Sequence, residues 1–280
     1  NCRGHGWANL QSCHLNLPFA NDEEFGRLHA AIRFLLPLLP ALAASSPILD
    51  GEPSGLMDAR LREYQRNCQR IPSISAGVIP EPVFSRRQYR SKILRRIYAD
   101  IAPFDPDGVL QDEFLNARGA IARFQRNAIE IRVLDIQECP QADLAILELI
   151  AAVLRNLALE RWVDGRRQRE FETERLGRIL AATMKEAESA VIADAEYLQA
   201  FEYGEPVCSA GELWAHLWRL ACAGSGRLPD RTSPLGVIFR HGSLARRIMR
   251  AMKDGFSRER QREVYGVLCD CLAAGRMFVP

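Results

Sequence analysis

Apolar and polar residues alternate in two short parts of the first half of the chain. The segment NLQSCHLNLPF, residues 9–19, has leucines and a cysteine on one side of the alternation and His14 and Asn16 on the other. The segment GAIARFQRNAIEIRVLDIQECP, residues 119–140, alternates twice, on either side of Arg126-Asn127. Alternation with a period of two is typical of strands buried on one face, and a short polar break between two such strands favours a tight turn. The pattern therefore predicts an early strand and a later β-hairpin.

Helical spacing dominates the rest of the chain. A helix is expected after a cap at Asn21 or Asp22, and another begins at Pro140 with an apolar centre. The other predicted helices cover residues 56–70, 85–101, 168–203, 209–223, 234–253 and 257–274. Strands thus cluster in the first half while helices fill the second, which favours an α+β fold over an alternating α/β fold. We expect one domain, residues 1–280, with 141–280 mainly helical.

Composition excludes several classes of protein. The chain has 280 residues, of which 48% are hydrophobic, so it can bury a large core. Its longest apolar stretch, residues 31–44, is interrupted by prolines and is too short to span a membrane. A formal net charge of +2 argues against nucleic-acid binding. Eight irregularly spaced cysteines without a CxxC motif predict reduced thiols in a cytoplasmic protein.

The beginning of the sequence bears on completeness. The chain starts NCRGHGW, with no methionine and no signal-peptide pattern, and a strand follows within ten residues. We therefore expect that the natural N-terminal part, with further strands, is missing. A sheet that lacks those strands exposes an edge, and exposed edges pair with other chains. The corresponding prediction is a homodimer formed through that edge, or a chain derived from a longer protein.

The two predicted strand regions each carry a pair of polar residues on one face. Glu130 and Arg132 lie two residues apart, as do His14 and Asn16, so each pair points to one side of its strand. Carboxylate and imidazole groups ligate divalent metals, and a guanidinium binds phosphate. Phosphoryl transfer needs both a metal and a fixed cation. The simpler alternative, that Glu130 and Arg132 form ordinary ion pairs with their neighbours, remains open at this point.

Four blocks of sequence point to a known family. They are SCHLNL, LPLLPALAASSPILDGEPSGLMDARLREY, AIEIRVLDIQECPQADLAI and DGFSRERQR, and they occur in this order. Together they resemble the second family of glutamate–cysteine ligases, which are carboxylate–amine ligases related to glutamine synthetase. The resemblance runs from His5 to about Arg262 and is weaker between residues 65 and 120. It implies an antiparallel sheet of the glutamine-synthetase catalytic-domain type, with helices on one face.

The resemblance also implies an activity and its cofactors. ATP and Mg²⁺ would activate the carboxylate of a glutamate-like acid as an acyl phosphate, and a cysteine-like amine would then attack to form an amide. Metal binding is assigned to Glu130 and His14, and contact with the transferred phosphoryl group to Arg132. Arg60, which stands on the characteristic arginine of its block, is assigned to the substrate carboxylate or a phosphate.

The ATP site is assigned to three residues on the predicted strands and their turn: His14, Asn16 and Arg126. Two departures from the family pattern matter here. Asn16 stands where a second histidine is usual, and no glutamate-bearing E-x-E strand occurs before residue 9. The metal site would then be incomplete within this chain. The alternative is a non-catalytic or incomplete ligase-fold module that acts in binding or assembly.

Two other features have structural explanations. His29 lies on the first predicted helix beside apolar residues, and we expect it to be half-buried or solvated. The charged run RRQYRSKILRR, residues 86–96, is typical of a solvated helix face, with nucleotide binding as the alternative.

Overall fold

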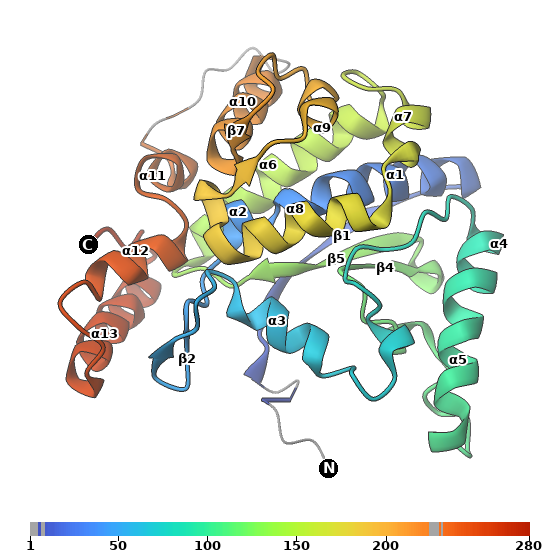
Figure 1. Ribbon diagram of the computed structural model, residues 1–280, viewed down its shortest axis with the longest axis horizontal. Coiled ribbons are helices and arrows are strands. Elements are labelled where there is room, and N and C mark those ends of the chain that lie inside the picture. The colour runs from blue at the N-terminus through green and yellow to red at the C-terminus, as the bar shows by residue number, and fades with distance from the viewer. Residues whose placement is uncertain (1–4, 7–8, 224–229, 231) are drawn as a thin grey trace.

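The structure of the protein is a computed structural model that describes residues 5–6, 9–223, 230 and 232–280. Its central element is a three-stranded antiparallel sheet with the strand order β1-β5-β4 (Figure 1). The strands are β1 (Ser12–Pro18), β4 (Ala120–Arg123) and β5 (Ala128–Asp135). The predicted early strand and the predicted hairpin are therefore both present, and they pair with each other.

The register of the sheet separates an apolar face from a polar one. Leu15 lies opposite Ile131, and Asn16 lies opposite Glu130. Ile131 is buried in the main hydrophobic core, as are its neighbours at alternate positions of β5. Side chains alternate across a strand, so Glu130 projects from the other face. The pattern of the sequence thus places its polar pairs away from the apolar core.

The hairpin closes through a short turn that the sequence marks clearly. A 3₁₀ turn, η7 (Phe124–Arg126), leads into Asn127, whose φ of 48° lies in the left-handed region. Asparagine tolerates this conformation better than most residues do. The turn occurs at Arg126-Asn127, as predicted, and it sets the register in which Ile121 of β4 lies opposite Glu130.

Helices cover the apolar face of the sheet. In Figure 1, α1 (Asp22–Leu35), α6 (Pro140–Ala158) and α8 (Thr173–Glu186) lie on the upper side of the strands. Asn21 caps α1 by accepting a hydrogen bond from the Glu24 backbone N–H at 2.9 Å, and the Glu24 carboxylate accepts one from the Ala20 N–H at 2.7 Å. This reciprocal arrangement fixes the start of the helix directly after β1.

Other helices lie below the sheet or beside one of its ends. In Figure 1, α3 (Ala59–Arg66) lies below the strands, while α4 (Arg86–Tyr89) and α5 (Arg95–Ile101) stand at the right. A five-residue π turn, η4 (Arg90–Leu94), joins α4 to α5. Helices therefore lie on both sides of the sheet, although the resemblance implied helices on one face, because α3 covers part of the polar face.

Two of the long predicted helices are interrupted. The expected helix over 168–203 is divided into α7 (Gly165–Glu170), α8 and α9 (Ala195–Gln199), with β6 (Val191–Ile192) pairing with β7 (Cys208–Ser209). The break follows α8 directly, where Ala187 has a φ of 48°. The expected helix over 234–253 divides into α11 (Pro234–His241) and α12 (Leu244–Ala251) at Gly242, whose φ is 87°.

The C-terminal helices form a small core of their own. Leu244, Ile248, Val264, Cys271 and Phe278 pack together between α12 and the last helix. The remaining regular elements are α2 (Pro40–Ala43), α10 (Ala210–Ala223), α13 (Arg258–Ala274), and the short pair β2 (Ile48–Leu49) and β3 (Glu52–Pro53).

The fold confirms the α+β class and its antiparallel sheet. The glutamine-synthetase likeness of the sheet stays a prediction. Within the described residues, no helix is long and apolar enough to cross a membrane. The seven cysteines that the structure describes are all free.

The expectation for His29 is wrong. Its side chain is only 1% exposed, and it packs in a cluster of aromatic rings that includes Phe25 and Tyr89. Burial, together with the positive charge of Arg33, lowers the pKa of His29 to about 3, so the ring is neutral.

Candidate active site on the polar face of the sheet

Glu130 is the centre of a group of charged side chains on the polar face. The Nε atom of Arg132 lies 2.8 Å from its Oε1 atom, and the Nδ1 atom of His14 lies 3.4 Å from the same oxygen. The Nη1 atom of Arg123 lies 3.7 Å from Oε2. Two arginines and one histidine from three different strands thus surround one carboxylate.

This environment keeps the Glu130 carboxylate ionised, although Glu130 is only 5% exposed. The hydrogen bond to His14 and the charge of Arg132 lower its pKa to about 2, against the opposing effect of burial. His14 is itself held in place, because its Nε2 atom lies 2.7 Å from the Ser12 hydroxyl. The carboxylate is therefore a fixed negative charge at neutral pH.

Arg132 connects this group to α3. Its Nη1 atom donates to the Asn116 carbonyl at 3.3 Å, and Tyr64 on α3 forms a hydrogen bond with its side chain. Burial lowers the pKa of Arg132, but the neighbouring Tyr64 and Glu130 raise it by more, so the guanidinium remains charged. Helix α3 thus supplies a part of the polar site that the strands alone do not contain.

Arg60, one turn before Tyr64 on α3, forms a second group with Asp135 at the end of β5. The Arg60 Nε atom donates to the Asp135 carboxylate, and both side chains are buried. Asp135 also accepts from the Ser45 N–H and the Ser46 hydroxyl, each at 2.8 Å. The Asp135 carboxylate therefore joins α3, β5 and the loop after α2.

The remaining nitrogens of Arg60 have no partner among the described residues. Its Nη1 and Nη2 atoms are buried and form no hydrogen bond with the described residues. Buried polar groups in proteins are almost always hydrogen-bonded, so a pair of free guanidinium nitrogens needs an explanation. A planar anion such as a carboxylate or a phosphate matches this pair of donors.

Asp58 lies beside the Arg60–Asp135 pair, and its pKa is shifted in the opposite direction from that of Glu130. Its Oδ1 atom caps α3 by accepting from the Leu61 N–H at 2.8 Å, while its buried Oδ2 atom is without a described partner. Burial, and then the charge of Asp135, raise the pKa of Asp58 to about 8. A neutral Asp58 adds no negative charge beside the Arg60–Asp135 pair.

The structure brings together most of the residues that the sequence analysis singled out. His14, Glu130 and Arg132 share one group, and Arg60 forms the adjoining group with Asp135. Asn16 lies opposite Glu130 in the register and is exposed. Their assigned roles remain predictions.

Arg126 is placed differently from the others, because it is exposed at the hairpin turn. Arg123, three residues earlier, is the arginine that reaches Glu130, and the sequence analysis missed it. The signal was available, since Ile121 and Arg123 alternate onto the face that carries Glu130. Tyr64 and Asp58 were also missed, because their contacts depend on how α3 docks.

The charges of the site suit an anion better than a free cation. Arg123 and Arg132 contact the Glu130 carboxylate, and Arg60 contacts the Asp135 carboxylate. Among the described residues there is no group of three or more His, Cys, Asp or Glu side chains that could hold a metal ion. Glu130 and His14 therefore form only a partial donor set for Mg²⁺, and the described residues do not complete a metal site.

These features define a class of protein: an α+β domain in which an antiparallel sheet and one helix form a buried, arginine-rich polar site. The sequence specifies the family within that class. The chain matches the profile of glutamate-cysteine ligase family 2 over residues 3–270, and it belongs to that family.

Three curated relatives match shorter segments. An uncharacterized protein of Archaeoglobus fulgidus is 44% identical over 155 residues, which cover 55% of this chain and 42% of that protein. A "Putative glutamate--cysteine ligase 2-1" of Nocardioides sp. is 28% identical over 163 residues, which cover 58% of this chain and 38% of that protein. A protein of the same name from Streptomyces avermitilis is 31% identical over 160 residues, which cover 57% of this chain and 39% of that protein. The matched segments thus span about two fifths of each relative.

Proposed function

We propose that this chain carries the anion-binding part of an ATP-dependent carboxylate–amine ligase. The observation that supports this most is the pair of buried Arg60 nitrogens without a partner, next to the Asp135 carboxylate. The substrates are an amino acid with a glutamate-like carboxylate and an amine such as that of cysteine, which the family and the names of two relatives support.

Each charged side chain then has a distinct task. Arg60 binds the substrate carboxylate, or a phosphate, through its two free nitrogens. Arg132 contacts the phosphoryl group as it transfers, since its position is fixed by Tyr64 and Glu130. Fixed cations stabilise charge that develops on the phosphoryl oxygens, without having to reorganise during the reaction.

Magnesium and ATP belong to the same proposal. Mg²⁺ usually keeps several water molecules and binds one or two carboxylates together with substrate phosphates. Glu130 would supply the carboxylate, and His14 a further contact with the metal or with a phosphate. The ion would neutralise phosphate charge. Because the described donor set is partial, the remaining ligands would come from the nucleotide, from water, or from residues beyond this set.

The partial donor set also favours a second candidate function. A family member that binds amino acids or nucleotides without turning them over would retain the arginines and need no complete metal site. Such a binding or assembly module would keep Arg60 and Arg132 because their loss would leave buried carboxylates unpaired.

One experiment separates the two functions. ADP release is measured with magnesium-ATP, with glutamate as the acid and with a panel of amines, cysteine first. Amine-dependent ADP release supports the ligase. Binding of magnesium-ATP by the folded protein, without ADP release from any acid–amine pair, supports the binding module and overturns the ligase.

The Arg132→Ala variant tests the assignment within the ligase. It should lower turnover by roughly 100-fold or more while changing the affinity for ATP much less, because the contact strengthens as the phosphoryl group moves. Arg66→Ala is the matched control, since Arg66 is exposed on α3 and pairs only with Glu63 among the described residues. Equal losses of turnover and ATP affinity in Arg132→Ala would contradict the assignment.

A further inference from the structure

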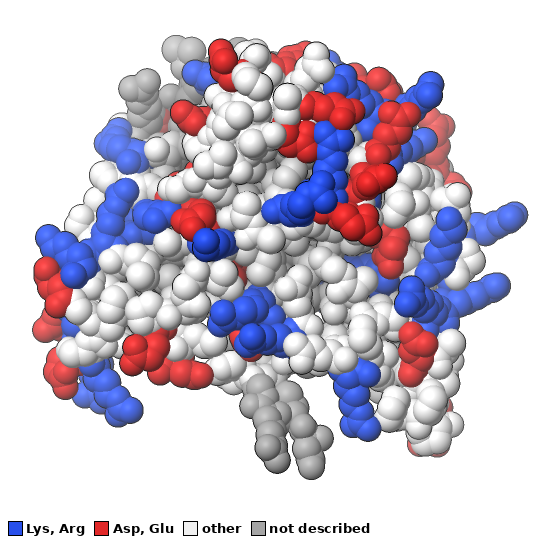
Figure 2. Space-filling model, in the orientation of Figure 1, with Lys and Arg blue, Asp and Glu red and all other residues white. Residues whose placement is uncertain are grey.

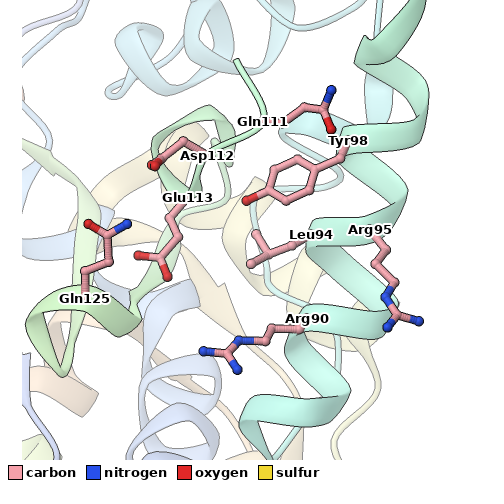
Figure 3. Close-up of a pocket in the computed structure, with 8 residues that line it drawn as sticks. All are labelled: Arg90, Leu94, Arg95, Tyr98, Gln111, Asp112, Glu113 and Gln125. Atoms are coloured by element: carbon pink, nitrogen blue, oxygen red, sulfur yellow. The ribbon is translucent and has the colours of Figure 1, made fainter. Parts of the chain in front are cut away.

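A hollow lies beside the helix that α4, η4 and α5 form. Its volume is about 330 Å³. The residues that line it are Arg90, Leu94, Arg95, Tyr98, Gln111, Asp112, Glu113 and Gln125. Figure 3 shows Arg90, Tyr98 and Glu113 pointing toward a common space, whereas Arg95 points away from it. The hollow thus has one guanidinium on its helix side and a carboxylate on the facing segment.

Both charged groups contact the same residue, Phe124. The guanidinium carbon of Arg90 lies 5.1 Å from the centroid of the Phe124 ring. The Oε1 atom of Glu113 accepts a hydrogen bond from the Phe124 backbone N–H at 3.2 Å. A positive and a negative group therefore both lie against Phe124.

The charged residues of the hollow do not neutralise each other. Within the part of the chain that the structure describes, none of Arg90, Arg95, Asp112 and Glu113 forms an ion pair. Their separation here leaves one donor group and one acceptor group that a dipolar ligand could bridge.

The surroundings strengthen this arrangement. Burial, and then the charges of Asp112 and Glu113, raise the pKa of Tyr98. Arg90 and Leu94 belong to the π turn η4, a backbone form that occurs often at functional sites. Figure 2 shows basic side chains along the right edge of the molecule, where Figure 1 places α4 and α5.

We propose that this hollow binds the zwitterionic head of a free α-amino acid. Arg90 binds the carboxylate of the ligand, Glu113 binds its ammonium group, and Tyr98 provides a hydroxyl beside the ammonium. Leu94 and the ring of Tyr98 offer apolar contacts for a small side chain. The proposal does not rest on the ligase activity, because it concerns binding in the absence of ATP.

The test is a titration of the whole chain, followed by ligand-observed NMR, with L-alanine as the probe. Propionate lacks the ammonium group and L-alaninamide lacks the carboxylate, so each presents one charge only. We expect L-alanine to bind at least about tenfold more tightly than either analogue, because each charge-assisted hydrogen bond contributes that much.

Two substitutions locate the binding. Glu113→Gln keeps an acceptor for the Phe124 N–H but removes the charge, and it should weaken L-alanine binding about tenfold while leaving propionate unchanged. Arg90→Gln should weaken both. Lys92→Gln is the control, because Lys92 is exposed on the same π turn and does not line the hollow. The proposal is overturned if L-alanine does not bind, if it binds no better than the analogues, or if both variants bind it like the unchanged protein.

Discussion

Two buried arginines pair with carboxylates at the end of β5 or just after it. Arg247 on α12 pairs with Glu138, and both side chains are fully buried. Its Nη1 atom also donates to the Phe278 carbonyl at 2.6 Å, and its Nε atom to the Gly242 carbonyl at 3.2 Å. Arg60 on α3 pairs with Asp135, yet its two Nη atoms are buried without a described partner.

The difference distinguishes Arg247, whose guanidinium nitrogens are all hydrogen-bonded within the fold, from Arg60, which has two nitrogens available for a ligand. The two other buried arginines behave like Arg247, since Arg33 and Arg118 use every guanidinium nitrogen in hydrogen bonds to described residues. Arg60 is the exception among the four buried arginines that the structure describes. Leaving buried donors unpaired costs stability, so the exception is more simply explained by a ligand than by packing.

The largest loss of stability should come from breaking the Arg247–Glu138 pair. Arg247→Met should lower the free energy of unfolding by about 3–5 kcal/mol, because it leaves the Glu138 charge buried without a partner. Urea denaturation followed by circular dichroism measures this loss. The small C-terminal core should detach first, since the pair joins α12 to the segment after β5.

A double substitution provides the control for Arg247. Glu138→Gln combined with Arg247→Met removes both charges and should restore part of the lost stability. If Arg247→Met cost less than 1 kcal/mol, the pair would behave like an exposed ion pair, and the contrast with Arg60 would lose its basis.

The second effect is a loss of stability in acid. The folded pKa of Glu130 is about 2, below its ordinary value, so the stability it contributes is present above pH 4.5 and is lost as the pH falls toward 2. The shift corresponds to about 3 kcal/mol at most. Glu130→Gln should therefore be less stable than the unchanged protein at pH 7 and nearly equal to it at pH 2. The exposed Glu148→Gln should show no such convergence.

The strand part of the site could be predicted from the sequence, whereas its helix part could not. Alternation alone put His14 and Glu130 on polar faces, because side chains of a strand change sides at every residue. The contacts of Tyr64 and Asp58 depend on the position of α3, which no local pattern specifies. Arg126 and Arg123 show the limit most clearly, since both flank the same turn and the register decides which of them reaches Glu130.

The breaks within the long helices could not be predicted from the sequence for a related reason. The segment after α8 has helical spacing, but Ala187 adopts a left-handed φ and the chain then pairs as β6 with β7. Likewise, burial of His29 could not be inferred from its helix alone, because the rings that surround it come partly from other elements, including Phe84 and Tyr89. Tertiary contacts decided these cases.

The third effect is a loss of stability as the pH rises, opposite in direction to the loss expected from Glu130. Burial raises the pKa of Asp58 to about 8, so its contribution to stability is fully present below pH 3.8 and is lost as the pH rises through 8. Asp58→Asn stays neutral and can still cap α3 through its side-chain oxygen. It should be more stable than the unchanged protein at pH 8 by on the order of 2 kcal/mol, and about equal at pH 4. Thermal melts across this range would show whether the gap closes.

The smallest loss of stability should come from Arg60 itself, with the clearest loss of binding. Arg60→Met removes the ion pair to Asp135, but it also removes two buried donors without partners, and Asp135 keeps its bonds to Ser45 and Ser46. These terms oppose each other, so the free energy of unfolding should change by only about 1 kcal/mol. Affinity for glutamate or for magnesium-ATP, measured by calorimetry, should nevertheless fall at least about tenfold. Arg66→Met on the exposed side of α3 should keep both properties. If Arg60→Met unfolds as readily as Arg247→Met and binds both ligands as before, Arg60 serves the fold and the two buried arginines do not differ in purpose.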